Sequence, residues 1–489
     1  MALAEKAAAV PDLAAYYGSH GLRPIFMGER AGELREALRD AIATAPQHGI
    51  PAGRYATAAL AADAHDAATE VGQARILVRY MRDMTGGMVR PASVDPLIKR
   101  EVGRPPIDRL IRDFTQAPDP RRFLLDLQPH HPAYLALQRA LTVPKTLAVP
   151  ADLPRVPEGL WRTGMRGEGI VPLRARLGSI GFDATASDPL AYDAALADAV
   201  ARYQAAVGLP SDGVAGPKTI RHLNGDVPDD AGSRAIVVAL ERMRWMGSED
   251  LDARHVWVNI PEYTARIMEN GTEVFRTRVV VGHRDHDRQT PEFSDEIEYV
   301  VANPRWNVPR SITVKEYLPK LQANRHAVSH LDVVDGNGNV IARDRIDFGR
   351  YTAANFPYRM RQKPSDDNAL GLVKFIFPNP WNIYLHDTPT KHLFGNAMRA
   401  HSHGCIRIGD PFDLAYALLS RQTDDPKTMF HRALDRGNEA WLKLTPFVPV
   451  HLVYFTAFPD ADGTIRRFED VYGRDAALYD AIQKAGLDS

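Results

Sequence analysis

The hydrophobic periodicity of the chain changes near residue 250, and this change limits the possible folds more than any other feature. Before it, apolar residues such as Leu34 and Leu38 recur three or four positions apart, a spacing that is typical of amphipathic helices. After it, apolar and polar residues alternate around Asn270-Gly271, a dipeptide that strongly favours a β-hairpin. A chain of 489 residues is also too long for one hydrophobic core. The sequence therefore predicts an α+β multidomain protein.

The charge balance and the cysteine count narrow the classes of function. The chain has 60 Lys and Arg against 61 Asp and Glu, a net charge of −1, which argues against a nucleic-acid partner. No apolar run is long enough to span a membrane, and a single cysteine rules out an internal disulfide. The first residues, "MALAEKAAAVPDLAAYYG", lack the pattern of a signal peptide. Either the protein is cytosolic or its export signal is not part of the chain shown.

The helical half divides into several segments. Residues 1–160 are predicted to form a helical scaffold domain, and they contain no cluster of reactive side chains. Residues 163–224 show two helical patterns and then the turn "PSDGVAGPKT" before a third helix, so we expect a small three-helix domain. Residues 233–249 are predicted to form a connecting helix. The C-terminal segment, 461–489, is expected to pack on the scaffold or on the β-rich domain.

The β-rich part covers residues 250–460. It contains the strand-like runs "EIEYVVAN", "LVKFIF", "WNIYLH" and "PVHLVYFTAF", which predict a mixed sheet. Within it, residues 315–370 are polar and irregular, with "DGNGN" and "FPYRMRQKPSDDN". A segment of this length without a regular pattern is typical of an insertion over a domain, so we expect a lid there.

The stretch with the most reactive side chains is "HSHGCIRI", which holds Cys405. A thiol reacts as its thiolate, and a nearby imidazole can remove its proton. If the stretch is extended, His401, His403 and Cys405 share a face, and Gly404 lets backbone N–H groups turn towards a substrate carbonyl. Three interpretations stay open from these residues alone: a Cys–His nucleophile, a zinc site, and a buried, inert thiol.

The spacing around Cys405 resembles a known signature. His386 is followed by fifteen residues, 387–401, and then by Ser402-His403-Gly404-Cys405. This pattern resembles the signature of the L,D-transpeptidases. The segments "VVVGHRDHDRQTPEF" and "NPRWNVPRSI" are similar to parts of the large, multidomain branch of that family. That branch also carries a helical N-terminal region, a peptidoglycan-binding module and a lid insertion, so the resemblance implies a scaffold, a binding domain and a mixed-sheet catalytic domain here.

The small helical domain resembles the peptidoglycan-binding type 1 domain. The matching residues are Tyr203-Gln204, Gly208-Leu209, "DGVAG" and Thr219 to Asn224. A generic three-helix domain is the alternative.

The family resemblance assigns the catalytic roles. It implies that His386 is the general base and that Asp387 holds its ring through a main-chain carbonyl. It places His403 on the oxyanion side, with the backbone N–H groups of Gly404 and Cys405. Distance along the sequence favours His403 as the base instead, and this alternative stays open.

The remaining candidates are predicted to bind substrate, together with Asp387. Tyr384 should share a face with His386, as a wall of the substrate site or as a core tyrosine, and Trp306 is a candidate pocket wall. Ser402, the first residue of the Ser-His-Gly-Cys motif, is also predicted to bind substrate. Arg407, where many family members have Asn, either binds a substrate carboxylate or pairs with Asp410. The other two nearby histidines, His392 and His401, are expected on the surface or in loops.

The resemblance implies a cell-wall enzyme. The Cys405 thiolate would be acylated by a peptidoglycan tetrapeptide stem with release of D-Ala, and a second stem would close a 3→3 crosslink. With water as the acceptor of the acyl group, the enzyme would be a carboxypeptidase or endopeptidase. With a protein amine as the acceptor, it would attach an outer-membrane protein to the wall. The alternative without catalysis is a cell-wall-binding scaffold. The expected partners are stem peptides and glycan, with no nucleic acid, no membrane span, no metal and no cofactor. We expect the protein to act in the periplasm after removal of its export signal, and carbapenems to acylate Cys405.

Overall fold

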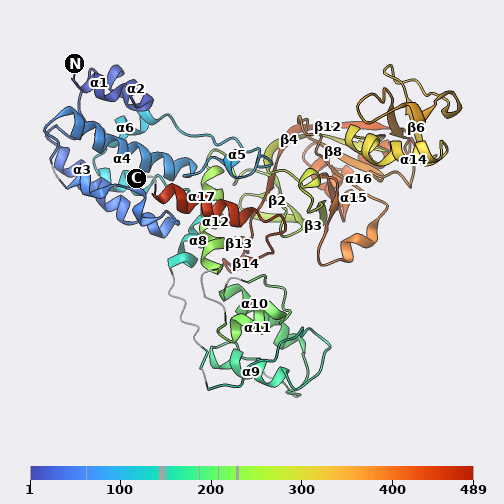
Figure 1. The fold of residues 1–489 in the computed structure, drawn as a ribbon, viewed down its shortest axis with the longest axis horizontal. Helices are drawn as coiled ribbons and strands as arrows, with labels where there is room; N and C mark the ends of the chain where they lie inside the picture. Colours follow the sequence, from blue (N-terminus) through green and yellow to red (C-terminus); the bar gives the residue numbers. More distant parts are fainter. Residues whose placement is uncertain are drawn as a thin grey trace. The chain divides into compact units, whose positions relative to one another are not determined.

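The computed structural model describes residues 2–61, 63–142, 149–150, 152–184, 186, 188–207, 209–226 and 231–487. They form two compact units, the first from Met1–Asp250 and Tyr454–Ser489, the second from Leu251–Val453 (Figure 1). The predicted fold class, an α+β multidomain protein with a helical N-terminal region and a β-rich catalytic part, is confirmed. No helix in the described ranges is both long enough and apolar enough to span a membrane.

The first unit is mostly helical. Its helices are α1 (Ala2–Ala7), α2 (Pro11–Ser19), α3 (Ala31–Ala43), α4 (Ala67–Gly86), α5 (Pro91–Val94), α6 (Ile107–Gln116), α7 (Pro120–Leu125), α8 (Pro132–Thr142), α9 (Ile170–Ser179), α10 (Ala194–Val207), α11 (Pro217–Leu223), α12 (Ala231–Trp245) and α17 (Arg474–Leu487). Two short strands, β13 (Ala457–Pro459) and β14 (Ile465–Arg467), pair antiparallel. Residues 454–460 were predicted in the β-rich domain, but they lie in the first unit because β13 packs on α8 and α12.

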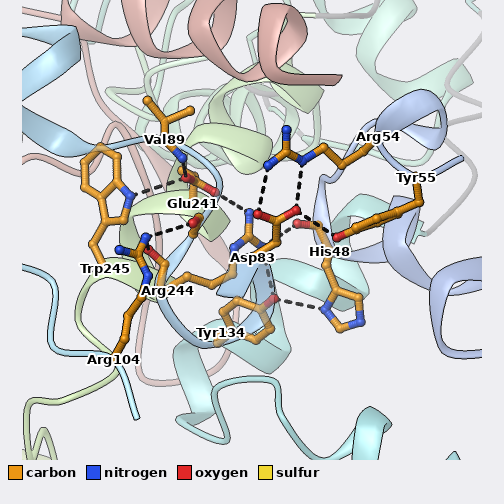
Figure 2. A network of polar contacts seen from close by, with 12 residues as sticks. His48, Arg54, Tyr55, Asp83, Val89, Arg104, Tyr134, Glu241, Arg244 and Trp245 are labelled. Atoms are coloured by element: carbon orange, nitrogen blue, oxygen red, sulfur yellow. Dashed lines mark hydrogen bonds and ion pairs between the residues drawn. The ribbon is translucent and has the colours of Figure 1, made fainter. Parts of the chain in front are cut away.

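A buried polar network joins the scaffold helices to α12 (Figure 2). Glu241 and Arg244 of α12 are fully buried and form an ion pair at 2.6 Å. The Glu241 carboxylate also accepts from the backbone N–H of Val89 at 2.8 Å, and Arg244 donates to the carbonyl of His48 at 2.7 Å and to the Tyr134 hydroxyl at 3.2 Å. Two buried charges are stable here because each has several hydrogen-bond partners.

The three-helix domain is held together by the glutamine that the sequence singled out. The Gln204 side chain accepts from the backbone N–H of Gly213 at 3.0 Å and donates to the Thr219 hydroxyl at 3.0 Å. It therefore ties the "DGVAG" turn to α10 and α11. Gly208, another residue of the resemblance, lies outside the described residues.

The second unit is built on one large mixed sheet. Its strands are β1 (His255–Asn259), β2 (Thr264–Glu269), β3 (Thr272–Gly282), β4 (Phe293–Ala302), β8 (Val373–Ile376), β9 (Leu385–His386), β10 (Ala400–Ser402), β11 (Ile406–Ile408) and β12 (Ala440–Val453). Their order is β10-β3-β11-β9-β8-β4-β12-β1-β2, and β2 also pairs with β3, so the sheet closes on itself. Figure 1 shows the long strands β4 and β12 side by side. Helices α15 (Pro411–Leu419) and α16 (Pro426–Leu434) follow β11.

The predicted hairpin at Asn270-Gly271 is confirmed. Strands β2 and β3 pair antiparallel across these two residues, which have φ values of 51° and 70°. Two positive φ values in a two-residue loop are the geometry for which Asn-Gly is preferred.

The insertion in this unit has a core of its own. Strands β5 (Trp306–Asn307), β7 (Arg359–Gln362) and β6 (Leu331–Val334) form a separate sheet in the order β5-β7-β6. Two helices, α13 (Arg310–Ile312) and α14 (Leu318–Ala323), flank a π-helical turn at Thr313–Tyr317. The apolar core of this insertion runs from Trp306 to Leu370, so the compact part begins before residue 315.

Candidate active site

Cys405 lies in a bend between β10 and β11. Residues 403–405 are not extended, so the alternation that would place His401, His403 and Cys405 on one face is interrupted. Gly404 has a φ of 111°, which side-chain-bearing residues rarely adopt. A Cβ atom there would also lie 3.2 Å from Cδ1 of Ile383. The glycine of the motif is therefore required by the bend itself.

Two buried hydroxyl groups hold this bend. The Ser402 hydroxyl donates to the Cys405 carbonyl at 2.5 Å and accepts from the Gly404 N–H at 3.1 Å. The Thr290 hydroxyl donates to the Gly404 carbonyl at 2.8 Å and accepts from the Gly282 N–H at 2.9 Å. The Gly404 amide is thus occupied, whereas no acceptor for the Cys405 amide lies among the described residues. Ser402 therefore shapes the Cys405 bend.

The register of three strands brings the other candidates together. Strands β9 and β11 are parallel, with Arg407 opposite His386, and β8 places Lys374 opposite His386 on the other side. Tyr384 precedes this pair by two residues and shares its face. The opposite face carries fully buried apolar residues: Phe375, Leu385 and Ile406. One sheet face therefore gathers the polar side chains beside the bend that holds Cys405.

His386 is buried and its orientation is fixed. Its Nδ1 lies 2.5 Å from the main-chain carbonyl of Asp387, and a carbonyl can only accept, so Nδ1 carries the hydrogen and Nε2 is left as the basic atom. The Asp387 carboxylate accepts from the backbone N–H of Leu372 at 2.9 Å and pairs with Lys391. Burial, followed by the charge of Arg407, lowers the pKa of His386 to about 3. The imidazole is neutral at physiological pH.

The thiol is also neutral at rest. Burial raises the pKa of Cys405 to about 11, although hydrogen bonding with Tyr384 and the charges of Lys374 and Arg407 act in the opposite direction. The sulfur lies 3.5 Å from the carbonyl of Asn382. Because burial moves the pKa of the thiol up and that of the imidazole down, a resting thiolate–imidazolium pair is disfavoured.

Tyr384 lies between the Cys405 bend and the insertion. Its ring centroid is 5.7 Å from that of His386, and Lys374 Nζ lies 5.0 Å from the Tyr384 centroid. Burial and the neighbouring Cys405 raise the pKa of the Tyr384 hydroxyl. The tyrosine packs against the core of the insertion, in which Trp306 is buried beside Tyr317 with ring centroids 6.4 Å apart.

The structure separates the other histidines from this face. His403 Nε2 lies 2.7 Å from the carboxylate of Glu316, in the π-helical turn of the insertion. His401 Nε2 lies 3.1 Å from the carbonyl of Met398, and His392 is exposed. Among the described residues, no group of three His, Cys, Asp or Glu side chains has an arrangement that could hold a metal ion.

Arg407 does not pair with Asp410. Its guanidinium donates to the Thr390 hydroxyl at 2.9 Å, while the Asp410 carboxylate accepts from Thr277 at 2.8 Å. Burial lowers the pKa of Arg407. Pairing with Asp410, one of the two alternatives for this arginine, is therefore wrong, and binding of a substrate carboxylate stays a prediction.

Sequence reasoning missed Lys374 and Thr290. Lys374 is the one charged residue in the apolar run "LVKFIF", and a lysine inside a strand pattern was a signal that could have been used. Thr290 belongs to "QTPEF", which was noticed only as part of a family segment.

Family models match three parts of the chain. Residues 11–141 match a "Scaffold domain", residues 166–223 a "Putative peptidoglycan binding domain", and residues 253–437 an "L,D-transpeptidase catalytic domain". These matches confirm the resemblance to multidomain L,D-transpeptidases with a peptidoglycan-binding domain.

One curated relative and one solved structure are similar. A protein of Haemophilus influenzae described as a "Putative L,D-transpeptidase" is 34% identical over 225 residues, which is 46% of this chain and 45% of that protein. The matched region thus spans less than half of that relative. A crystal structure of residues 123–326 of an L,D-transpeptidase from Xylanimonas cellulosilytica matches 61% of this chain and all of its own at 14% identity, with a TM-score of 0.18. A TM-score this low supports no argument about the fold.

Proposed function

The chain carries an L,D-transpeptidase catalytic domain together with a peptidoglycan-binding domain, and from this premise we propose that it is a peptidoglycan L,D-transpeptidase with Cys405 as its nucleophile. The observation that supports this most directly is the sheet face beside the Cys405 bend. It holds a buried imidazole, His386, with Nδ1 bound to a carbonyl and Nε2 left as the base. A neutral imidazole with a free Nε2 on the face beside a thiol is a candidate to take its proton.

His386 is a better candidate base than His403. His386 is buried, neutral and fixed by the Asp387 carbonyl, whereas His403 is partly exposed and bound to Glu316. A base must be unprotonated to accept the thiol proton, and burial keeps the His386 imidazole unprotonated.

The proposed reaction has two halves. The Cys405 thiol passes its proton to Nε2 of His386 while the sulfur attacks the carbonyl carbon that precedes the terminal D-Ala of a tetrapeptide stem. The C–N bond then breaks, the His386 proton goes to the departing amine of D-Ala, and a thioester remains on Cys405. A side-chain amine of a second stem attacks the thioester, gives a proton to His386, and releases the thiol with a 3→3 crosslink.

The negative oxygen of each tetrahedral intermediate needs donors nearby. The Cys405 amide is the best placed donor because the Gly404 amide already binds Ser402. We therefore propose that His403 serves the oxyanion side only if its contact with Glu316 opens.

The insertion favours an amine over water as the acceptor. It has its own apolar core, packs on Tyr384 and contacts the Cys405 bend through the Glu316–His403 pair. A cover of this kind would keep water from the thioester, since hydrolysis would make the enzyme a carboxypeptidase. A protein amine, such as that of an outer-membrane protein, is an alternative acceptor.

The peptidoglycan-binding domain would keep the enzyme on its polymer and raise the local concentration of stems. Glycan and stem peptides are then the partners, and the site of action is outside the cytoplasm, in the periplasm. In this mechanism the chain's own residues carry every step, so no metal or cofactor is proposed.

Acylation of Cys405 is the test. The full chain is incubated with a disaccharide-tetrapeptide, and intact-protein mass spectrometry follows a covalent adduct on Cys405 and then a crosslinked dimer or a free tripeptide. We expect the adduct with the wild type and with His403→Gln, and none with Cys405→Ala or His386→Ala. Normal acylation of His386→Ala would make His403 the base. Absence of any adduct, with binding to wall sacculi retained, would favour a wall-binding scaffold.

A further inference from the structure

Lys374 is a charged residue in an apolar strand that forms part of the active-site sheet face. It is half-buried in β8, between the fully buried Val373 and Phe375. Its register partners are His386 in β9 and Val301 in β4. The side chain therefore points to the same face as the imidazole, next to Tyr384 and the Cys405 bend.

No ion pair explains this lysine. Among the described residues, no carboxylate lies within salt-bridge distance of Lys374 Nζ. The ammonium group instead lies 5.0 Å from the ring centroid of Tyr384 and 6.0 Å from that of Trp441. Two aromatic faces can hold a cation that has lost part of its water. Burial lowers the pKa of Lys374, and a perturbed charge beside a reactive side chain is a candidate for a functional role.

The groups around this face are mostly cationic or neutral. They are Tyr384 just before β9, neutral His386 in β9, Arg407 in β11 and exposed Trp441 in β12. Glu439 lies just before β12, and its charge acts on Lys374. The Glu316 carboxylate of the insertion binds His403. The Asp387 carboxylate pairs with Lys391 and accepts a hydrogen bond from the Leu372 amide. The charges of Lys374 and Arg407 both favour a negative charge at Cys405.

We propose that Lys374 is a positioning residue for the nucleophile, and that its unpaired ammonium group stabilises the thiolate that forms at Cys405 during attack. This inference rests on Cys405 being the nucleophile of the proposed function, but it adds a residue that the motif does not contain. The direction of one effect agrees with it: the charge of Lys374 lowers the pKa of the Cys405 thiol, although burial has the larger, opposite effect.

The test measures the thiol without any substrate. Iodoacetamide is a neutral electrophile that reacts with the thiolate, so the pH dependence of its reaction rate with Cys405 follows the thiolate fraction. Lys374→Met keeps the apolar stem against the two rings and removes the charge, and Lys374→Gln is a second neutral variant. Removal of an opposite charge should raise the thiol pKa by on the order of one unit, so the rate at a given pH should fall about tenfold. Lys374→Arg should restore the wild-type rate.

Lys443→Gln is the matched control. Lys443 also lies over an aromatic ring, 5.3 Å from the centroid of Phe447, but it is exposed, and its strand β12 is separated from β8 by β4. Its removal should leave the alkylation rate unchanged, and thermal unfolding should show that each variant is folded. A folded neutral variant that reacts at the wild-type rate overturns the proposal. If that variant has normal alkylation but lacks transpeptidation, Lys374 instead contacts the substrate. Because alkylation requires no transpeptidation, this test is separate from that of the proposed function.

Discussion

The pH dependence of Cys405 reactivity is the most direct test of the active-site electrostatics. Because burial raises the pKa of the Cys405 thiol to about 11, the fraction of thiolate falls as the pH falls below that value. At pH 8 it is about one part in a thousand, and it drops about tenfold for each further pH unit. His386, with a pKa of about 3, carries no charge over this range and cannot hold the thiolate as an ion pair.

The assay is the rate of iodoacetamide alkylation of Cys405 between about pH 6 and pH 9.5, with the adduct counted by mass spectrometry. We expect the logarithm of the rate to rise with a slope of one over the whole range. The variant His386→Gln should follow nearly the same line, because a neutral imidazole contributes little to the thiolate. A plateau that reaches below pH 7 in the wild type, and disappears in His386→Gln, would show a resting thiolate–imidazolium pair and would refute this reasoning.

Three further predictions concern the rest of the structure. Glu241→Gln should destabilise the first unit by about 3–5 kcal/mol in urea unfolding, because it leaves the fully buried charge of Arg244 uncompensated; an unchanged midpoint would count against the network of Figure 2. Gly404→Ala should lower the acylation rate at least tenfold while costing only about 1–2 kcal/mol of stability, since the strain is local to the bend; equal acylation of both proteins would mean that the bend can change shape. Glu316→Gln should increase amide hydrogen exchange at residues 313–317, and His403→Gln should have the same effect with no addition in the double variant; additive effects would show that the two residues act separately.

Local sequence patterns were enough to predict several features of this protein. The Asn270-Gly271 hairpin follows from the positive φ values that this dipeptide tolerates, and the change of hydrophobic period near residue 250 follows from the different repeat lengths of helix and strand. The spaced motif that ends in Cys405 pointed to the L,D-transpeptidase catalytic domain that the family model matches at residues 253–437, because its residues are close enough in sequence to be recognised without a fold. Glycine at position 404 also has a purely local cause, the φ of 111° in the bend.

Only the tertiary structure decided what surrounds the sulfur. Strand order is not encoded by any local pattern, so nothing in the sequence showed that β8 would lie beside β9 and bring Lys374 opposite His386. The bend at residues 403–405 turned His403 towards Glu316, although alternation along an extended strand would have placed it with Cys405. Burial raises the pKa of the thiol and lowers that of the imidazole, because removing water from the site penalises both the thiolate and the imidazolium. Desolvation depends on how distant segments pack, and for that reason it could not be read from the order of the residues.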